Sequence, residues 1–498
     1  MYVMSSERCK NIDNETVKEF NIPSILLMEN AATEVFSRIK EYEGRFTVIC
    51  GVGNNGGDGL AIGRKLLQYN RDVHFILINP NEKYSDDCYT NLNIVRKLTD
   101  NIYYVKSKSQ IKELQFIIKN SNVIIDAIFG IGLNRELNDF YKLIIESINN
   151  SKKQIISIDV PSGLDSNTGK PLGSSIKANL TYTFEVIKKG FIEYSSLEYL
   201  GQLKVISIGI PKQVKERNSE DIYILDESEY KKKMINRNVY GHKGTYGRAI
   251  LFAGSMGFTG AAYITTQSCL KTGAGLTTLV TPEECQAILS SKLIEAMTTN
   301  FDDKENIKRL LENANSIAFG PGIKSNKENE ENLLWIINNS KSNLVIDAEG
   351  INILGRRNDI LKKLSGRAIL TPHHGEMATL TGKSIDYVEK NRITLAKEVA
   401  RDNNCVILLK GYNTIITDGK LVYINKTGNS KMATGGMGDC LTGIITSLLA
   451  QGYDLLNSAL IGAYVHGKAA EEEGQDKCCV LASDVINKIS KIINTLNI

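Results

Sequence analysis

Three aspartates in the first half of the chain stand where acid–base chemistry is possible, and the first lies in a glycine-rich stretch. Residues 51–60 read GVGNNGGDGL and contain five glycines, two asparagines and Asp58. Glycines allow positive φ and close backbone approach, and amides at the start of a following helix receive anions. Oxygens from Asn54, Asn55 and Asp58 also suit a hard cation or ribose hydroxyls. A plain turn between a strand and a helix stays an open alternative.

The other two aspartates stand at the ends of apolar runs. Asp126 lies in NVIIDAIFGIGLNREL, and Asp159 lies in SIDVPSGLDSNTG. An unpaired buried charge is costly, so each residue is either a structural hydrogen-bond acceptor or a functional group. Two such aspartates beside a glycine-rich stretch favour a functional site.

The second half carries a different pattern, KMATGGMGDCLTGII, at residues 431–445. Gly435, Gly436 and Gly438 predict a turn, and Asp439 opens a predicted amphipathic helix. Free amides at that helix start would form an anion hole for a transferred phosphoryl group, and the carboxylate could take a proton from an attacking hydroxyl. The alternative is an ordinary N-cap aspartate after a glycine turn.

Neighbouring motifs favour the phosphoryl-transfer interpretation. VILLKGYNTIIT places Lys410 and Thr414 on a strand and turn, where the lysine can meet a nucleotide phosphate. TPHHGEMATLTG adds His373, His374 and Glu376 at another strand end, but the histidines lack a third ligand at a spacing suited to a metal. Two more glycine loops, FAGSMGFTGAA and FGPGI, follow apolar runs.

These motifs must be positioned by alternating strands and helices. The first 40 residues have helical periodicity, and the chain is again helical from Gly438 onward. Between them, apolar strand-like runs are separated by helical stretches. In the first half the runs are RFTVIC, DVHFILI, NIYYV, NVIIDAIF, QIISIDV and LKVISIGI. In the second half they are GRAILFAG, LTTLVTP, SIAFGPG, NLVIDAEG, AILTPHHGE and VILLKGYNTIIT. This pattern predicts doubly wound α/β folds with mainly parallel sheets, whose ligands bind at the carboxyl ends of the strands.

Length and composition set the remaining bounds. A chain of 498 residues exceeds one ordinary core, and a polar stretch around residues 213–235 predicts domains at 1–215 and 240–498 joined by a linker at 216–239. A net charge of +4 and 42% hydrophobic residues indicate a globular protein without nucleic-acid or membrane partners. Nine scattered cysteines without a CxxC pair, and an N-terminus without a signal pattern, favour the cytoplasm.

Over residues 1–215 the motifs GNNGGDGL, DAIFGIGL and DVPSGLDSNTG resemble the NAD(P)H-hydrate epimerase domain. The resemblance implies a Rossmann-like three-layer fold, Asp159 as the acid/base residue, and potassium held by Asn55, Asp126 and Ser162. It departs from the family at Val52, where proline is usual. The implied substrate-lining residues are Asn54, Asn55, Gly56, Gly57, Asp58, Gly130, Ile131, Gly132, Leu133, Asn134, Arg135, Glu136 and Asp159.

From residue 240 to 498 the chain resembles the ribokinase-like ADP/ATP-dependent NAD(P)H-hydrate dehydratases. The resemblance implies that Asp439 is the catalytic base. Met437 stands where the family commonly has threonine, and DAEGIN stands where DAD-like motifs are usual. The implied nucleotide-binding residues are Lys410, Gly411, Tyr412, Asn413, Thr414 and Gly438. The implied substrate-binding residues are Ala253, Gly254, Gly322, His373 and Asp439.

Together the two resemblances imply repair of hydrated NADH or NADPH. The first domain would interconvert the R and S hydrates, since inverting a carbinol carbon beside a ring nitrogen requires proton transfers that a positioned carboxylate can perform. In the second, Asp439 would deprotonate the hydroxyl of the S epimer, and phosphate from ADP or ATP, with magnesium, would be transferred and then leave. The resemblance to bacterial fused enzymes favours ADP, and we expect a homo-oligomer.

Two alternatives remain open from the residues. The first is a ribokinase-like kinase for a vitamin precursor, because one fold supports several substrates. A fused epimerase-like domain argues against it. The second makes the first domain a nucleotide-binding or scaffolding module without catalysis, against which the retained Asn55, Asp126 and Asp159 argue.

Overall fold

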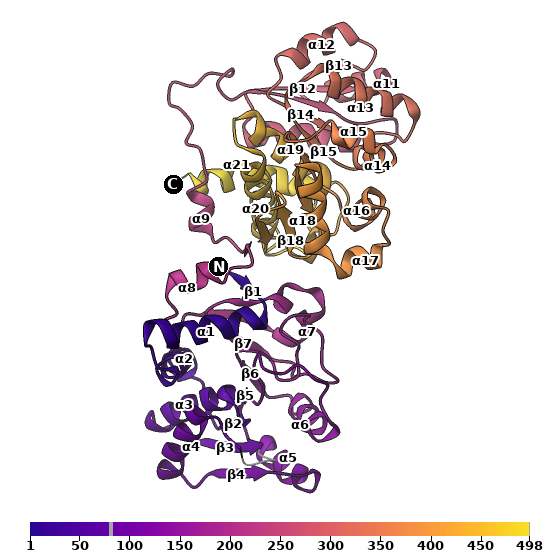
Figure 1. Cartoon of the computed structure of the whole chain (residues 1–498). Coiled ribbons are helices and arrows are strands. Elements are labelled where there is room, and N and C mark those ends of the chain that lie inside the picture. Colours follow the sequence, from indigo (N-terminus) through magenta and orange to yellow (C-terminus); the bar gives the residue numbers. More distant parts are fainter. Residues whose placement is uncertain (79–82, 498) are drawn as a thin grey trace. The chain divides into compact units, whose positions relative to one another are not determined.

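The computed structural model describes residues 1–78 and 83–497 and divides the chain into two compact units (Figure 1). Unit 1 is Met1–Glu220 and unit 2 is Asp221–Ile498. The segment 216–239, for which the sequence predicts a linker, is shared between them. Its residues from 221 onward belong to unit 2 and contain β10 (Ile222–Tyr223) and α9 (Glu227–Lys231).

Unit 1 is built on a parallel sheet whose described strands have the order β4-β3-β2-β5-β6-β7-β9. The chain runs outward from β2 to β4 and then returns to the other side of β2 with β5. A topological switch point therefore lies between β2 and β5, where ligands of open α/β sheets bind. The strands are β2 (Phe46–Cys50), β3 (Val73–Ile78), β4 (Ile102–Val105), β5 (Val123–Ala127), β6 (Gln154–Ile158), β7 (Leu180–Phe184) and β9 (Gln202–Ile206).

Helices cover both faces of this sheet. Val48 and Cys50 pack with α1 to α4 on one face, whereas Ile49 packs with α5 and α6 on the other. This alternation of buried side chains gives the three layers of a doubly wound fold and confirms the predicted fold class. The helices are α1 (Ser6–Phe20), α2 (Ser24–Ile39), α3 (Asn54–Gln68), α4 (Asp86–Leu98), α5 (Ile111–Lys119), α6 (Asp139–Asn149), α7 (Leu197–Leu200) and α8 (Lys212–Arg217). A short separate pair joins β1 (Val3–Met4) to β8 (Ile187–Lys188).

Two local predictions for unit 1 need correction. The first 40 residues form two helices rather than one helical segment, because α1 ends at left-handed Asn21 and α2 begins after Pro23. Residues 54–60 of the glycine-rich stretch are the first turns of α3 and not a loop. The strand β7 (Leu180–Phe184) was not predicted, since the threonines and tyrosine of LTYTF interrupt its apolar pattern.

The glycines of residues 51–60 serve close packing rather than unusual backbone angles. None of these five described glycines has a positive φ, so of the two roles considered, positive φ and close backbone approach, only the second applies. A Cβ on Gly56 would collide with the carbonyl oxygen of Gly51, and a Cβ on Gly59 would collide with the side chain of Ala127. The missing side chains therefore let α3 lie directly against β2 and β5.

Unit 2 is built on a sheet whose described strands have the order β10-β19-β18-β17-β16-β15-β14-β11-β12-β13. Strands β11 to β17 are parallel, while β17–β18 and β18–β19 are antiparallel. The run VILLKGYNTIIT is thus a hairpin. The switch point lies between β11 and β14. The remaining strands are β11 (Arg248–Phe252), β12 (Leu276–Thr281), β13 (Met297–Asn300), β14 (Ser316–Phe319), β15 (Asn343–Ile346), β16 (Ala368–Leu370), β17 (Val406–Leu409), β18 (Thr414–Thr417) and β19 (Val422–Asn425).

One face of the unit 2 sheet packs against α10, α19, α20 and α21. Residues 440–450 of α19 are all buried, so the prediction of an amphipathic helix there is wrong. No helix in the described ranges is long and apolar enough to cross a membrane. The helices are α10 (Thr259–Thr272), α11 (Glu283–Ser290), α12 (Lys304–Glu312), α13 (Lys327–Asn339), α14 (Glu349–Arg356), α15 (Asn358–Lys362), α16 (His374–Thr381), α17 (Ile385–Lys390), α18 (Arg392–Asn403), α19 (Met437–Ala450), α20 (Leu455–Glu473) and α21 (Ala482–Leu496).

Candidate functional site

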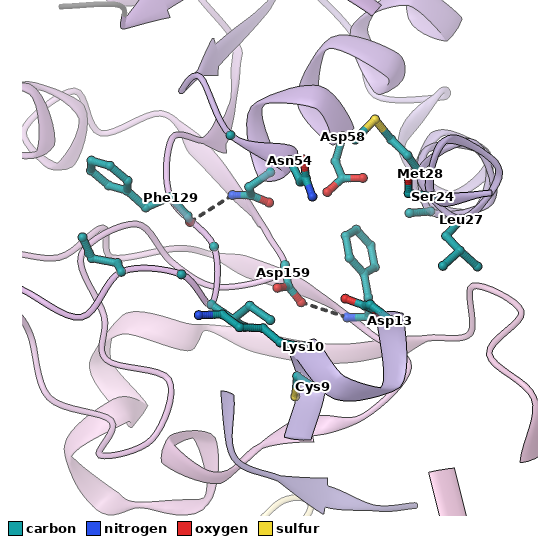
Figure 2. Close-up of a pocket in the computed structure, with 18 of the residues that line it drawn as sticks. Cys9, Lys10, Asp13, Ser24, Leu27, Met28, Asn54, Asp58, Phe129 and Asp159 are labelled. Carbon is teal, nitrogen blue, oxygen red and sulfur yellow. Dashed lines mark hydrogen bonds between the residues drawn. The ribbon is translucent and has the colours of Figure 1, made fainter. Parts of the chain in front are cut away.

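A cavity of about 670 Å³ lies at the switch point of unit 1 (Figure 2). Its walls come from α1, α2, the start of α3, and the segments that follow β5 and β6. Most of the predicted substrate-lining residues meet here, namely Asn54, Asn55, Asp58, Gly130, Ile131, Gly132, Leu133, Asn134, Arg135 and Asp159. Three predicted residues are not among the described lining residues. Gly56 and Gly57 are buried within α3, and Glu136 bonds to Lys142 at 2.9 Å.

Asp159 directly follows β6 and is held by several donors. Its φ is 62°, a left-handed conformation that costs a non-glycine residue about 1–3 kcal/mol. Its Oδ1 lies 2.6 Å from Lys188 Nζ and accepts weaker bonds from Phe184 N at 3.3 Å and Thr183 Oγ1 at 3.4 Å. Its Oδ2 lies 3.7 Å from where a Cβ of Gly130 would stand, on the cavity side.

The sequence interpretation missed Lys188, the ion-pair partner of Asp159. Its ammonium also donates to the carbonyl oxygens of Phe184 at 3.0 Å and Val186 at 3.5 Å. Burial alone would lower the pKa of Lys188, but the neighbouring Asp159, Cys9 and Asp13 together raise it. The available signal was a lysine that directly follows the apolar pair Val186-Ile187, but next to Lys189 it looks like part of an exposed basic pair.

Asp126 is fully buried and already satisfied by hydrogen bonds. It accepts bonds from Ser157 Oγ at 2.7 Å, Ser162 N at 2.9 Å and Ser162 Oγ at 2.5 Å. Burial raises the pKa of Asp126, although these bonds oppose the rise. The carboxylate therefore fixes the turn after β6 against β5 and faces the hydroxyl of Ser162 rather than the substrate cavity.

The three residues predicted to hold potassium meet around the backbone of Phe129. Asn55 Nδ2 donates to Phe129 O at 2.9 Å, and Ser162 Oγ accepts from Phe129 N at 2.9 Å. Asn55 Oδ1 is buried without a hydrogen-bond partner. An orphaned amide oxygen beside a hydroxyl, a carboxylate and a backbone carbonyl is a donor set that fits a hard cation. No group of three or more His, Cys, Asp or Glu residues suited to a metal occurs in the described ranges.

Two further carboxylates line the same cavity. Figure 2 shows Asp58 and Asp159 extending toward the cavity from opposite walls. Burial, followed by the charges of Asp159 and Asp13, raises the pKa of Asp58 well above its usual range. Asp13 on α1 also lines the cavity, and burial raises its pKa to about 7 against the opposing charge of Lys188. The sequence interpretation did not single out Asp13.

The predicted phosphoryl-transfer turn of unit 2 has the expected local geometry. Gly436 has a φ of 89° and is the N-cap of α19, and Asp439 lies in the first turn of that helix. Burial, followed by the nearby Asp347, raises the pKa of Asp439 to about 6, although Lys410 opposes the rise. A carboxylate beside free helix amides can accept a proton next to a bound anion.

Lys410 lies directly beneath this turn and is paired with Asp347. Its Nζ is 2.7 Å from Asp347 Oδ1 and 3.7 Å from Glu376 Oε2. Thr442 Oγ1 donates to the other oxygen of Asp347 at 2.8 Å. A Cβ on Gly438 would stand 3.3 Å from Lys410 Nζ, so the ammonium faces the helix start. Burial alone would raise the pKa of Asp347, but Lys410 and the hydrogen bonds from Thr442 and the Ala348 backbone together lower it.

Three of the predicted substrate-binding residues of unit 2, Ala253, Gly254 and Gly322, lie at its switch point. Ala253 and Gly254 follow β11, and Gly254 N donates to Pro321 O at 2.8 Å in the loop after β14. Gly254 and Gly322 have φ values of 91° and 66°, which favour glycine. His373 follows β16 and is the N-cap of α16. These loops and the start of α19 are therefore carried by the same edge of the sheet.

The predicted nucleotide turn connects β17 to β18. Arg392 donates to the carbonyl oxygens of Tyr412 at 2.5 Å and Asn413 at 2.8 Å. Asn413 has a φ of 52°, and Thr414 Oγ1 donates to Gly411 O at 3.0 Å. These bonds fix the turn, and the side chain of Tyr412 remains exposed.

The glycine turn before α19 is also tied to a distant part of the chain. Thr434 Oγ1 donates to Val480 O at 2.8 Å, and Val480 N donates to Lys431 O at 2.9 Å. Val480 lies just before α21, the last helix in the described residues. The segment that precedes α21 therefore supports the turn that carries Asp439.

Family models match both units. Residues 24–190 match the model described as YjeF-related protein N-terminus, and residues 249–491 match the model described as NAD(P)H-hydrate dehydratase. The two matched ranges contain all the predicted catalytic residues, Asp159 in the first and Asp439 in the second.

Similar proteins match along the whole chain. The chain is 33% identical to a bifunctional NAD(P)H-hydrate repair enzyme of Moorella thermoacetica, over 100% of this chain and 97% of that relative. It is 32% identical to the enzyme of the same name from Dictyoglomus turgidum, over 100% of both chains. A solved ribokinase-like superfamily protein from Enterococcus faecalis has a TM-score of 0.52 and 24% identity, over 56% of this chain and 97% of that protein. This last likeness shows a ribokinase-like fold.

Proposed function

This chain belongs to the family of bifunctional NAD(P)H-hydrate repair enzymes, and we propose that its two units carry out the two steps of that repair. Residues 1–215 interconvert the R and S hydrates of NADH and NADPH, and residues 240–498 dehydrate the S hydrate in a nucleotide-dependent reaction. The observation that carries this proposal is one carboxylate at each switch point, Asp159 and Asp439, set in two different chemical surroundings.

In the exchange step Asp159 moves protons to and from the hydrate. Its free oxygen lies on the cavity side, and the opposite wall supplies the amides and side chains of Asn54 and Asn55. Potassium held by Asn55, Asp126 and Ser162 would supply a fixed positive charge beside the phosphate-bearing substrate. The orphaned amide oxygen of Asn55 supports this cation site.

In the dehydration step Asp439 takes the proton from the hydroxyl of the S hydrate. That hydroxyl attacks the terminal phosphate of ADP or ATP, and the phosphate ester then leaves as the ring double bond re-forms. Amides at the start of α19 receive the transferred phosphoryl group, and Lys410 adds positive charge below it. Magnesium would neutralise the nucleotide phosphates.

The nucleotide occupies the turn of residues 410–414, with Gly438 beside it, and the hydrate occupies the loops of Ala253, Gly254, Gly322 and His373. The turn is preorganised by Arg392, which supports its role as a binding surface. ADP is the favoured donor. We place the enzyme in the cytoplasm as a homo-oligomer, and the nine free cysteines support a reducing compartment.

The test is recovery of dihydronicotinamide absorbance from hydrated NADH incubated with the protein, magnesium and either ADP or ATP. We expect recovery of both epimers, because exchange feeds the R hydrate into dehydration. No recovery with either nucleotide would overturn the proposal. Accumulation of a stable phosphorylated product would instead support a small-molecule kinase.

A further inference from the structure

The cavity of unit 1 is lined by more carboxyl groups than a single proton-transferring residue accounts for. Asp13, Asp58 and Asp159 all line it, and Lys188 is the buried cation among them. We propose that Lys188 makes Asp159 the base of this cavity and that Asp58, on the opposite wall, is its acid. This inference rests on the proposed exchange function and assigns roles to two residues beyond it.

Lys188 is fixed on one oxygen of Asp159. Its side chain is 3% exposed, and its three N–H groups have three acceptors, namely Asp159 Oδ1, Phe184 O and Val186 O. A lysine held in this way cannot swing to another carboxylate. Phe184 N and Thr183 Oγ1 point at the same Oδ1. The remaining oxygen, Oδ2, is therefore the one that can exchange a proton with a ligand.

The other titratable groups around Lys188 and Asp58 come from four segments. Asp13 and the thiol of Cys9 on α1 and Asp58 on α3 act on Lys188, and Asp87 on α4 acts on Asp58. Glu185 belongs to the turn before Lys188, but it forms its own ion pair with Lys215. Neither Asp58 nor Asp13 forms an ion pair within the described ranges. Asp58 has a strongly raised pKa, which fits a carboxyl group that carries a proton when the substrate arrives.

Acid and base on opposite walls suit inversion of a carbinol carbon. Asp58 gives its proton to the hydroxyl oxygen, the C–O bond breaks, and the ring nitrogen lone pair forms a C=N bond as water leaves. A water on the other face loses a proton to Asp159, and its oxygen bonds to the same carbon while the C=N pair returns to nitrogen. Asp58 ends as a carboxylate and Asp159 as an acid.

Lys188 also explains how the site returns to its starting form. Water carries the proton from Asp159 Oδ2 back to Asp58, while Lys188 stays paired with Oδ1. In the opposite direction of exchange the two carboxyl groups swap roles. One buried lysine, paired with only one of the three carboxylates, thus distinguishes Asp159 from Asp13 and Asp58.

The first test is the pH dependence of exchange by Lys188→Met in the full chain, followed as conversion of pure S hydrate of NADH above the uncatalysed rate. We expect the acidic limb of the pH–rate profile to move to higher pH by about 1–3 units, because an opposite charge has been removed from the base. Lys188→Arg, which keeps the charge, should leave the limb in place. Lys189→Met is the matched control on the neighbouring residue.

The second test is Asp58→Asn, which we expect to slow exchange at least about 100-fold. Asp86→Asn, an exposed acid on α4, is its matched control. Thermal unfolding of every variant separates loss of folding from loss of chemistry. A uniform loss of exchange at all pH values in a folded Lys188→Met variant, or normal exchange in Asp58→Asn, would overturn the inference. Absence of exchange in the unsubstituted protein would instead overturn the proposed function itself.

Discussion

The two units place a buried lysine beside a catalytic-site aspartate in different ways. In unit 1, Lys188 contacts Asp159, the proposed acid/base residue itself, at 2.6 Å. In unit 2, Lys410 contacts Asp347 at 2.7 Å, and Asp439 is left beside that second carboxylate. A lysine ammonium therefore contacts the proposed base of unit 1, Asp159, directly. In unit 2 the ammonium contacts Asp347 and lies only near the proposed base, Asp439.

This difference changes the proton affinity of the unit 2 carboxylate. Burial and the charge of Asp347 raise the pKa of Asp439 to about 6. A general base works best when its pKa lies near the pH at which the enzyme operates. Lys410 meanwhile stays beneath the helix start, where it can attract a phosphate. Lys410, paired with Asp347, can therefore bind an anion while Asp439 stays able to accept a proton.

The largest expected effect tests whether the two carboxylates act independently. Asp439→Asn should lower nucleotide-dependent dehydration at least about 1,000-fold, because asparagine cannot accept the proton, and it should leave exchange unchanged.

Asp159→Asn should slow exchange, while pure S hydrate is still consumed by dehydration. Separate assays of epimer exchange and absorbance recovery measure both. Loss of both activities from either substitution would contradict the two-site assignment.

The next effect tests the pairing of Lys410. Asp347→Asn removes the nearest partner of a buried ammonium and leaves the more distant Glu376 and Asp439, so we expect unit 2 to lose about 3 kcal/mol of unfolding free energy. Urea unfolding followed by circular dichroism measures this loss, with separate transitions allowed for the two units.

Asp359→Asn is the matched control, because Asp359 pairs with Arg357 on the surface and should contribute much less to the unfolding free energy than the buried pair. A loss of similar size in the two variants would mean that the Lys410–Asp347 pair is not a stabilising element of unit 2.

The smallest effect concerns pH. Asp439 accepts a proton only when it is ionised, so dehydration should fall about tenfold for each pH unit below about 6. Initial rates of absorbance recovery between pH 5 and pH 8, with pure S hydrate and saturating nucleotide, measure this limb. A rate that stays constant down to pH 5 would show that Asp439 does not act as the base.

Much of the fold was predictable because its strands are continuous apolar runs. A buried parallel sheet demands such runs, and the polar residues that end them, such as Asp126 and Asp159, stand out against them. The same reasoning located Asp439 after its glycine turn. The doubly wound fold, and the carboxyl ends of the strands where the candidate sites lie, were therefore predictable from the local sequence pattern.

The residues that pattern could not find depend on packing between distant segments. Lys188 reads as one of two adjacent lysines, and only the fold shows that its ammonium is buried against Asp159. Asp13 lies on an ordinary polar helix that happens to wall the cavity. Glycine is a poor helix former, so residues 54–60 predicted a loop, but contact of α3 with β2 and β5 outweighs that preference.

Val480 is hydrogen-bonded to Thr434 and to Lys431, beside the glycine turn of unit 2. These bonds have a consequence for the order in which the two sites form during synthesis. The α1 wall of the unit 1 cavity is held by Glu220, whose carboxylate accepts from Ser5 N at 2.5 Å, and the described lining residues of that cavity all belong to unit 1. The glycine turn of unit 2 needs Val480. At about 5–20 residues per second, more than ten seconds of translation separate the two. A nascent chain can thus have a complete exchange site well before it has a complete dehydration site.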